Sequence, residues 1–347
     1  GCAVSKAIEV QDLVRNYGKL VAVDHISFDV KRGEVFGFLG PNGAGKTTTV
    51  RVLTTLLEPT SGRVLIGGHD ARTRPYQARR QIGLVPEESN IYTELSAWDN
   101  LMFSARLYRV PRTVRERRAS ELLQSFDLQD KRDVKTQSFS KGMRRRLTIA
   151  MALIHRPAIL FLDEPTSGLD VRSAQTIKET VRKLNADGTT VFLTTHQIEE
   201  ANQICDRVAI INRGRIAAID SPERLKRAME SVQLVEVAFD RNDEGQQAAL
   251  RSLAGVTAVV KHGDKWRLYT PDPPALLPLL FDYAVQRQLR IITLNTVGPS
   301  LEDVFLHLTG QEVGVAQQAQ EGEARGQGPG GQGRGQGQRG RGGASNG

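Results

Sequence analysis

The sequence comprises 347 residues with 39% hydrophobic residues and 33 glycines, a composition typical of soluble globular proteins that excludes fibrous and wholly disordered classes. Because single hydrophobic cores stop growing near roughly 250 to 300 residues, the length favours two domains over one. The net charge of +8, from 47 basic against 39 acidic residues, is compatible with nucleic acid or anionic membrane partners and chooses neither.

Residues 1–228 alternate short β-branched runs with helical patterns, as at 33–39, 158–163 and 189–195. Apolar runs of this length between helices are typical of strands buried on both faces of a largely parallel sheet. Residues from about 88 to 155 interrupt the alternation with arginine-rich helical sequence and no convincing strand. We interpret that segment as a helical subdomain inserted into an α/β core.

The pattern changes in residues 231–310, where strands and helices follow the order β-α-β-β-α-β of a ferredoxin-like fold. This order predicts a small α+β domain, with a closing helix over 300–309. Residues 311–347 are rich in Gly, Gln and Arg and contain no aromatic residue. Such a segment cannot bury enough apolar area to offset the entropy of ordering, so we expect a disordered tail. The expected strands and helices of the small domain cover 233–239, 246–254, 256–260, 265–270, 274–288 and 290–296.

Cysteines and apolar runs indicate the compartment. Cys2 and Cys205 lie far apart, so neither a disulfide framework nor a paired cysteine metal site is expected, and a reducing, cytoplasmic compartment follows. No apolar run approaches the roughly 18 residues that span a bilayer, and the N-terminus lacks the features of a signal peptide. We therefore expect that this polypeptide does not cross a membrane.

The motif with the clearest chemistry is GPNGAGKTT at residues 40–48, which follows a predicted strand and opens a predicted helix. That context is typical of a phosphate-binding P-loop. Glycines let backbone amides approach phosphate oxygens at the positive end of a helix, with no Cβ in the way. Lys46 adds a charge between the β- and γ-phosphates, and the Thr47 hydroxyl can bind Mg²⁺. The strand-loop-helix context disfavours a chance glycine turn.

A second motif places two carboxylates at the carboxyl edge of the same predicted sheet. The apolar strand AILFLD ends in Asp163, and Glu164 follows it. Asp163 suits the magnesium shell, and Glu164 is placed to polarise a water molecule against the γ-phosphate. An apolar strand ending in Asp-Glu is common by itself, and the P-loop upstream makes the catalytic interpretation the better one.

With these motifs in place, residues 8–220 resemble the nucleotide-binding subunit of an ATP-binding cassette (ABC) transporter. The P-loop matches the Walker A motif, and the acidic strand end matches Walker B. SGLD at 167–170 resembles the D-loop, and His196 matches the switch histidine. Tyr17 matches the aromatic residue that stacks on adenine, a contact that suits any base.

The sequence departs from the family pattern at the signature motif. LSGGQ reads FSKGM here, which keeps Ser140 and Gly142 and replaces a glycine by Lys141 and the glutamine by Met143. The resemblance implies that Ser140 and the amide of Gly142 still meet a γ-phosphate.

A second departure puts Glu87 where the family has a glutamine that senses the γ-phosphate and the metal. A carboxylate can still bind the metal, but it cannot donate a hydrogen bond while ionised. Both variants, and the ending PSLEDVFLHLTG at 299–310, resemble drug-resistance-type exporters whose membrane partner is an ABC-2 permease.

The resemblance implies an ATP hydrolase at the cytoplasmic face of the cell membrane that powers export of a small molecule or drug-like substrate through a separate permease. It also implies a head-to-tail homodimer with ATP between Walker A of one protomer and the signature of the other. The implied catalytic residues are Lys46, Glu164 and His196; the implied Mg²⁺ ligands are Thr47, Glu87 and Asp163; and the implied ATP-binding residues are Tyr17, Gly40, Pro41, Asn42, Gly43, Ala44, Gly45, Lys46, Thr47, Thr48, Ser140, Gly142 and Asp170.

The alternative function is a soluble ABC ATPase that acts on nucleic acid or ribosomes. The excess of basic over acidic residues and the tail rich in Arg and Gly are compatible with it. A single P-loop, the lack of a long heptad insertion and the lack of aromatic residues in the tail disfavour it, so no specific nucleic acid partner is expected. A P-loop GTPase would carry an N-K-x-D motif, which does not occur. The arginines of 106–118 form either a solvated helix face or a surface for permease helices or anionic headgroups.

Overall fold

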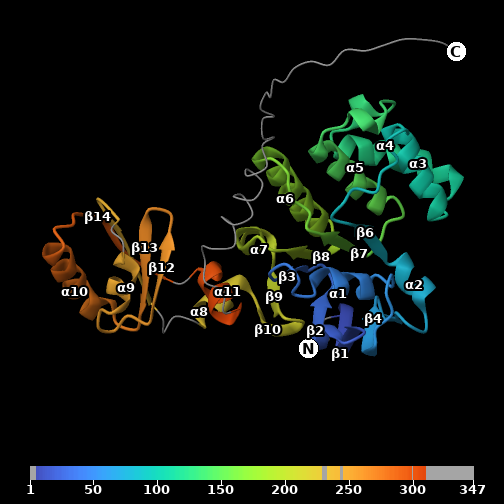
Figure 1. The fold of residues 1–347 in the computed structure, drawn as a ribbon. Helices are drawn as coiled ribbons and strands as arrows, with labels where there is room; N and C mark the ends of the chain where they lie inside the picture. Colours follow the sequence, from blue (N-terminus) through green and yellow to red (C-terminus); the bar gives the residue numbers. More distant parts are fainter. Residues whose placement is uncertain (1–4, 229–232, 243–244, 299, 310–347) are drawn as a thin grey trace, which may run out of the picture.

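The structure is a computed structural model that describes residues 5–228, 233–242, 245–298 and 300–309 (Figure 1). The predicted disordered tail at 311–347 and Cys2 lie outside the described residues, while Cys205 is a buried free cysteine. None of the helices in the described ranges combines the length and apolar character that crossing a bilayer requires.

A six-stranded sheet forms the centre of the first 228 residues, in the strand order β10-β9-β3-β8-β7-β6. β3, β6, β7, β8 and β9 are parallel, and β10 pairs antiparallel with β9. Every residue of β3, β7 and β8 is buried, as the continuous apolar runs predict. The bounds are β3 Val35–Leu39, β6 Ile82–Val85, β7 Ile159–Asp163, β8 Thr190–Thr195, β9 Arg207–Asn212 and β10 Arg215–Asp220.

A second, antiparallel sheet in the order β2-β1-β4-β5 packs against the first, and the expectation of a largely parallel core did not include it. Its pairing is non-local, since Ile8 of β1 lies opposite Ile66 of β4. Phenylalanine rings fill the space between the two sheets: Phe28 stacks on Phe36 with centroids 5.6 Å apart, and Phe36 on Phe192 at 5.8 Å. The bounds are β1 Lys6–Tyr17, β2 Leu20–Lys31, β4 Ser61–Ile66 and β5 His69–Asp70.

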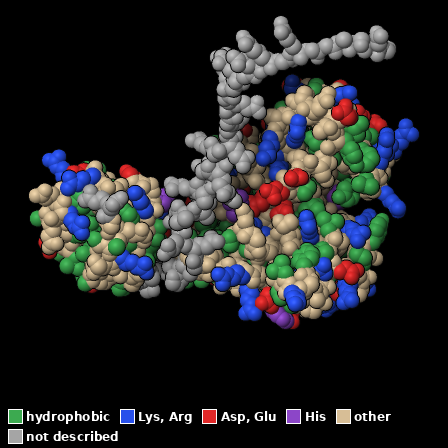
Figure 2. Space-filling model, viewed as in Figure 1, with side chains coloured by type: hydrophobic (Ala, Val, Ile, Leu, Met, Phe, Trp, Pro, Cys, Tyr) green, Lys and Arg blue, Asp and Glu red, His purple; other side chains and the backbone are tan. Residues whose placement is uncertain are grey.

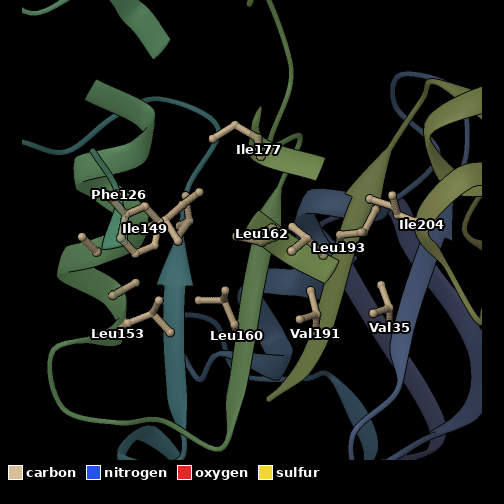
Figure 3. Packing of buried hydrophobic residues seen from close by; sticks show 14 of the residues in the cluster. Val35, Phe126, Ile149, Leu153, Leu160, Leu162, Ile177, Val191, Leu193 and Ile204 are labelled. Atoms are coloured by element: carbon tan, nitrogen blue, oxygen red, sulfur yellow. The ribbon is translucent and has the colours of Figure 1, made fainter. Parts of the chain in front are cut away.

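Helices cover the other face of the six-stranded sheet. Figure 3 shows side chains of β3, β7 and β8, including Val35, Leu160, Leu162, Val191 and Leu193, facing apolar side chains of the helices. Helices α6 Val171–Ala186, α7 Ile198–Ile204 and α8 Pro222–Arg227 contribute buried residues to this face. Helices α1 Lys46–Leu53 and α2 Pro75–Arg80 instead contribute to the core between the two sheets.

The segment predicted as a helical subdomain consists of three α-helices and two 3₁₀ turns, Gln129–Lys131 and Thr136–Ser138. In the described residues its only β interaction is an isolated bridge between Ser96 and Lys135. α3 and α5 begin at serine N-caps, Ser96 and Ser140, whose hydroxyls accept main-chain N–H groups three residues on. The bounds are α3 Ala97–Leu107, α4 Arg112–Ser125 and α5 Lys141–Leu153.

The C-terminal part has the predicted β-α-β-β-α-β order and an antiparallel sheet in the order β12-β13-β11-β14. Both helices pack on one face of this sheet, where Val235, Val237, Leu268 and Leu280 form a separate core. The bounds are β11 Gln233–Phe239, α9 Gln246–Arg251, β12 Ala258–His262, β13 Lys265–Thr270, α10 Pro273–Gln286 and β14 Ile291–Val297.

The last helix, α11 Leu301–Thr309, differs in placement from the expectation that it closes the small domain. Its buried residues Leu301, Val304 and Phe305 belong to the large core of the first 228 residues, and the helix lies against α7 and α8 (Figure 1). The apolar face of α11 is therefore covered by this large core and not by the small sheet. The Tyr269 hydroxyl donates to the buried carboxylate of Asp303, which joins the small sheet to this helix.

Candidate active site

The P-loop connects β3 to α1 and depends on glycine at two positions. Gly45 has a φ of 106°, and an added Cβ would lie 2.5 Å from the carbonyl oxygen of Ala22. A Cβ at Gly40 would lie 2.5 Å from the carbonyl oxygen of Ile211. Backbone from β2 and β9 thus closes around the loop, so a side chain at either glycine would displace it.

The remaining P-loop residues lie between these glycines and the first turn of α1. Ala44 is buried at 3% exposure, which holds the loop against the sheet. Asn42, Gly43 and Thr47 are exposed, while Pro41 and Thr48 are half-buried. The predicted phosphate-binding residues therefore form one continuous surface at the N-terminus of α1, where backbone N–H groups favour anions.

Lys46 is the first residue of α1, and it is only 6% exposed. Its ammonium group donates to the carbonyl oxygens of Gly40 at 2.7 Å and Pro41 at 3.2 Å. The same nitrogen lies 3.4 Å from Oε1 of Glu164. A buried ammonium needs such partners, because desolvation without them is costly. The structure thus brings together the predicted Lys46 and Glu164.

Glu164 is held rigidly at the end of β7. It is 7% exposed, and its backbone N–H donates to the carbonyl oxygen and hydroxyl of Thr194 on β8. Its φ of 47° lies in the left-handed region, which non-glycine residues rarely adopt. Strain of this kind persists only where neighbouring contacts impose it. Here the backbone conformation directs the carboxylate at Lys46 and His196.

His196 completes this cluster from the loop after β8. Its Nδ1 lies 2.9 Å from Oε2 of Glu164, so one carboxylate oxygen faces the histidine and the other faces Lys46. Burial acts to raise the pKa of Glu164, but the hydrogen bond from His196 and the charges of His196 and Lys46 outweigh it, and the net shift is downward. The bond to Glu164 raises the pKa of His196.

Asp163 and Glu87 both act on the charge of a buried arginine, Arg145, which the sequence motifs did not indicate. Arg145 of α5 is 2% exposed and donates to the carbonyl oxygens of Pro86 and Glu87. Burial lowers the pKa of Arg145, and the charges of Glu87 and Asp163 oppose this shift. The exposed side chain of Glu87 reaches toward Ser167, with 3.5 Å between Oε1 and Oγ.

The oxygen donors of this region suit magnesium. The Asp163 carboxylate is 6% exposed and accepts a hydrogen bond from the Thr194 hydroxyl, which orients it. In the described residues no cluster of three or more His, Cys, Asp or Glu side chains could hold a metal by itself. Mg²⁺ usually takes one or two carboxylates and completes its shell with phosphate and water oxygens, so a single buried carboxylate at Asp163, together with the exposed hydroxyl of Thr47 in the P-loop, fits that chemistry.

The signature and D-loop residues form a second cluster. An added Cβ at Gly142 would lie 2.5 Å from Oγ of Ser173 on α6. Ser173 donates through its hydroxyl to Asp170 at 2.6 Å and through its backbone N–H at 2.9 Å, so Asp170 caps α6. The Ser140 hydroxyl caps α5 by accepting the N–H of Met143 at 3.2 Å. Within the described ranges, the backbone N–H of Ser167 in the D-loop donates to the carbonyl oxygen of Glu164 at 3.2 Å, and no hydrogen bond joins the side chains of Ser140, Asp170 or Ser173 to those of Lys46, Glu164 or His196.

Tyr17 lies at the end of β1 with 42% of its surface exposed. The guanidinium carbon of Arg15 lies 4.8 Å from the ring centroid. The exposed ring of Tyr17 can stack on a planar base. The nearby Arg15 guanidinium would also attract the π-electrons of that base.

The missed Arg145 carries a recognisable signal. It lies three residues after Gly142, three before Thr148 and four before Ile149, all of which are buried in α5. A basic residue at a buried helical position therefore marks an internal contact. Arg144 and Arg146 on either side hide this signal, because a run of arginines reads as a solvated face.

Two family models match this chain, one over its first part and one over its C-terminal part. A family model described as "ABC transporter" matches residues 23–167, and one described as "ATP-binding protein DrrA1-3-like, C-terminal domain" matches 221–309. Linearmycin resistance ATP-binding protein LnrL of Bacillus subtilis is 35% identical over 306 residues, which cover 88% of this chain and 98% of the relative. Daunorubicin resistance ATP-binding protein DrrA3 of Streptomyces coeruleorubidus is 39% identical, covering 90% and 99%.

A further relative and two solved structures are also similar to this chain. Nod factor export ATP-binding protein I of Ralstonia nicotianae is 36% identical, covering 90% of this chain and 97% of the relative. Among solved structures, an ATP-binding subunit of an ABC transporter has a TM-score of 0.59 and 32% identity, covering 64% of this chain and 93% of its own. A dimeric ATP-binding cassette with ADP and phosphate, in a post-hydrolysis state, has a TM-score of 0.56 and 28% identity, covering 62% and 98%.

Proposed function

This chain belongs to the ATP-binding proteins of ABC transporters, and on that basis we propose that it hydrolyses ATP to drive export of a small molecule through a separate membrane permease. The relatives are ATP-binding proteins for drug resistance and Nod factor export, which supports export and does not favour an ATPase of nucleic acid or ribosomes. The observation that carries the proposal is Glu164 held between Lys46 and His196 beside the P-loop.

The chemistry follows from this cluster. The P-loop amides and Lys46 bind the phosphates of ATP, and Tyr17 stacks on the adenine. Glu164, ionised at neutral pH because its pKa is lowered, accepts a proton from the attacking water molecule. His196 orients the Glu164 carboxylate and donates a hydrogen bond toward the γ-phosphate side. Thr47, Asp163 and Glu87 are the proposed Mg²⁺ ligands, and the metal would neutralise charge that develops on the phosphates.

The second cluster acts across a dimer. Ser140 and the amide of Gly142 are proposed to contact the γ-phosphate bound by the partner protomer, and Asp170 of the D-loop is proposed to belong to the same ATP-binding surface. The dimeric relative supports this arrangement. Contacts made only in the closed dimer give ATP a differential affinity for that state. Two or three charge-assisted hydrogen bonds of about 1.5 to 3 kcal/mol each shift the dimer equilibrium by orders of magnitude, and hydrolysis removes them.

The closing motion is proposed to reach an ABC-2 permease at the cytoplasmic face of the cell membrane. A cleft of about 580 Å³ lies between the segment after β6 and the helical subdomain. Glu87, Ser89, Lys141 and Arg145 are among its lining residues, so it connects the γ-phosphate side with the signature helix. We propose this cleft as the permease contact, with residues 1–228 as the ATPase domain and 231–310 as a small accessory domain.

The test is Glu164→Gln, which keeps the shape of the side chain and removes its basicity. Steady-state phosphate release is expected to fall by at least about 100-fold, while ATP binding persists and the dimer accumulates on size exclusion. Glu199→Gln, on the exposed face of α7, is the matched control and should retain turnover. Undiminished phosphate release by Glu164→Gln would remove this residue from its role.

A further inference from the structure

The turn between α3 and α4 carries charge that the nucleotide site does not use. Residues 100–115 contain four arginines and no acidic residue. Arg106, Arg109 and Arg112 are exposed, and in the described part of the chain none of their side chains has an ion pair or hydrogen bond. Arg117 of α4 differs from them, because its Nε lies 3.5 Å from Oε1 of Glu121. The positive charge of this turn is therefore uncompensated.

Apolar side chains project from the same turn. Leu107 is 69% exposed and Tyr108 is 41% exposed. The Tyr108 ring lies flat on the ring of His155, with centroids 3.8 Å apart and planes 4° apart, which brings the exposed Arg156 to the same surface. We call Arg106, Leu107, Tyr108, Arg109, Arg112 and Arg156 the α3–α4 patch.

The turn is ordered by its own contacts. The backbone N–H of Val110 donates to the carbonyl oxygen of Ala105 at 2.8 Å, and Val110 itself is buried. Pro111 then precedes the first residue of α4. Because the backbone is held in this way, Leu107 and the arginines are presented together with no further cost of ordering the main chain.

The α3–α4 patch lies apart from the proposed permease cleft. Nε2 of His155 lies 2.9 Å from the carbonyl oxygen of Ile82, the first residue of β6. The cleft instead begins beyond the last residue of that strand, at Glu87. In Figure 2, Lys and Arg side chains project from the edge of the molecule that α3 occupies in Figure 1.

We propose that the α3–α4 patch binds the anionic headgroups of a phospholipid membrane, with Leu107 and Tyr108 entering the interfacial region. Arginine forks form bidentate hydrogen bonds with phosphate oxygens, and apolar side chains between cations add burial at the headgroup boundary. An outward leucine between cations suits a fluid surface, whereas a protein partner would need a complementary cavity for it. This inference goes beyond the proposed ATPase function, because it requires neither nucleotide nor permease.

The test is flotation of the purified full chain with vesicles, without ATP or permease. Wild-type protein is expected to float with phosphatidylcholine vesicles that contain phosphatidylglycerol, to float poorly with pure phosphatidylcholine, and to be released by salt. The triple variant Arg106→Glu, Arg109→Glu and Arg112→Glu should lower the partition coefficient by at least about 100-fold, since each basic residue near an anionic surface contributes about fivefold.

The matched control is Arg227→Glu, Arg251→Glu and Arg290→Glu, which changes net charge equally at exposed positions outside the patch. It should float like wild type. Leu107→Ser should weaken flotation without changing its salt dependence. ATPase activity of both triple variants reports their folding, so a failure of lipid binding is distinguishable from a failure of the ATPase assignment.

Several outcomes would overturn the proposal. Equal loss in both triple variants would attribute flotation to net charge. Equal flotation with pure phosphatidylcholine would exclude headgroup recognition. Full release by millimolar inorganic phosphate at constant ionic strength would identify a phosphate site. If the triple variant in the patch floated like wild type but no longer co-purified with the permease, or no longer bound RNA, the patch would be assigned to that partner instead of to lipid.

Discussion

The guanidinium of Arg145 donates a hydrogen bond to the main-chain carbonyl of Glu87, and thereby ties the signature helix α5 to the segment that follows β6. A second bond runs from Arg145 to the carbonyl oxygen of Pro86 at 2.5 Å. Both acceptors are backbone atoms, so the contact fixes the path of the chain and does not occupy the Glu87 carboxylate, which reaches toward Ser167. Movement of α5 must therefore move the segment of Glu87, or break two charged hydrogen bonds.

Arg145→Met should destabilise the protein strongly. Hydrogen bonds from charged groups contribute about 1.5 to 3 kcal/mol each, and two carbonyl groups would lose their donor, so we expect the free energy of unfolding to fall by about 3 kcal/mol. Urea denaturation measures this loss. Arg172→Met, at an exposed position of α6, is the control and should change stability by less than about 0.5 kcal/mol. Equal effects of the two variants would contradict the role of Arg145.

Gly142→Ala should disturb the D-loop through Ser173. The added Cβ lies 2.5 Å from Oγ of Ser173, and that hydroxyl is bonded to Asp170. We expect a loss of about 1 to 3 kcal/mol in unfolding free energy together with slower ATP hydrolysis. Adding Ser173→Gly removes the obstructing atoms and should recover part of the loss. A double-mutant cycle on stability tests this, and strictly additive effects would show that the clash does not occur.

The His196–Glu164 pair makes stability depend on pH in a defined direction. The pKa of His196 is raised above its ordinary value of 6.5. The pair with Glu164 therefore adds its full contribution to the free energy of unfolding below pH 6.5, and this contribution is lost as the pH rises through the folded-state pKa of His196. The pKa of Glu164 is lowered from 4.5, so Glu164 remains charged throughout this window.

Wild type should therefore exceed His196→Ala in stability most below pH 6.5, and the difference should shrink under alkaline conditions. Urea denaturation at a series of pH values measures the difference. Glu164→Gln serves as the second reference, since it removes the partner of His196 and should flatten the same dependence. A difference that grows with pH would contradict the pairing.

Phe305→Ala should destabilise the ATPase core rather than the small domain. Phe305 is 5% exposed and packs in the large core with Leu301 and Val304. Truncation of a buried phenylalanine costs about 3 to 5 kcal/mol. Trp98 and Trp266 are the two tryptophans of the chain, and they lie in the helical subdomain and the small sheet.

Single-tryptophan variants can therefore follow each part separately in denaturant. The transition reported by Trp98 should move to lower urea concentration in Phe305→Ala, with a smaller change at Trp266. Ile292→Ala, on a side chain that is 62% exposed, is the control. A shift of the urea transition that only Trp266 reports would show that α11 stabilises the small domain instead.

Much of the fold was predictable because local patterns and burial coincide. The apolar runs at 158–163 and 189–195 became β7 and β8, and the predicted C-terminal order became the sheet β12-β13-β11-β14. The antiparallel sheet was missed for a physical reason: β1 has several register shifts and alternates polar with apolar residues, and it pairs with β4 some fifty residues along the chain. Such pairing depends on contacts between distant segments.

The sequence by itself determined the chemistry available at each position: a glycine-rich loop ahead of Lys46, a carboxylate pair after an apolar strand, and an apolar face on α11. Only the tertiary structure decided which groups meet. It placed Glu164 between Lys46 and His196, put Arg145 against the segment of Glu87, and laid α11 on the ATPase core. A motif can be recognised from sequence because residues close together in the chain determine its backbone conformation. The burial of a charge or of an apolar face depends instead on surfaces from distant segments, which only the folded chain brings together.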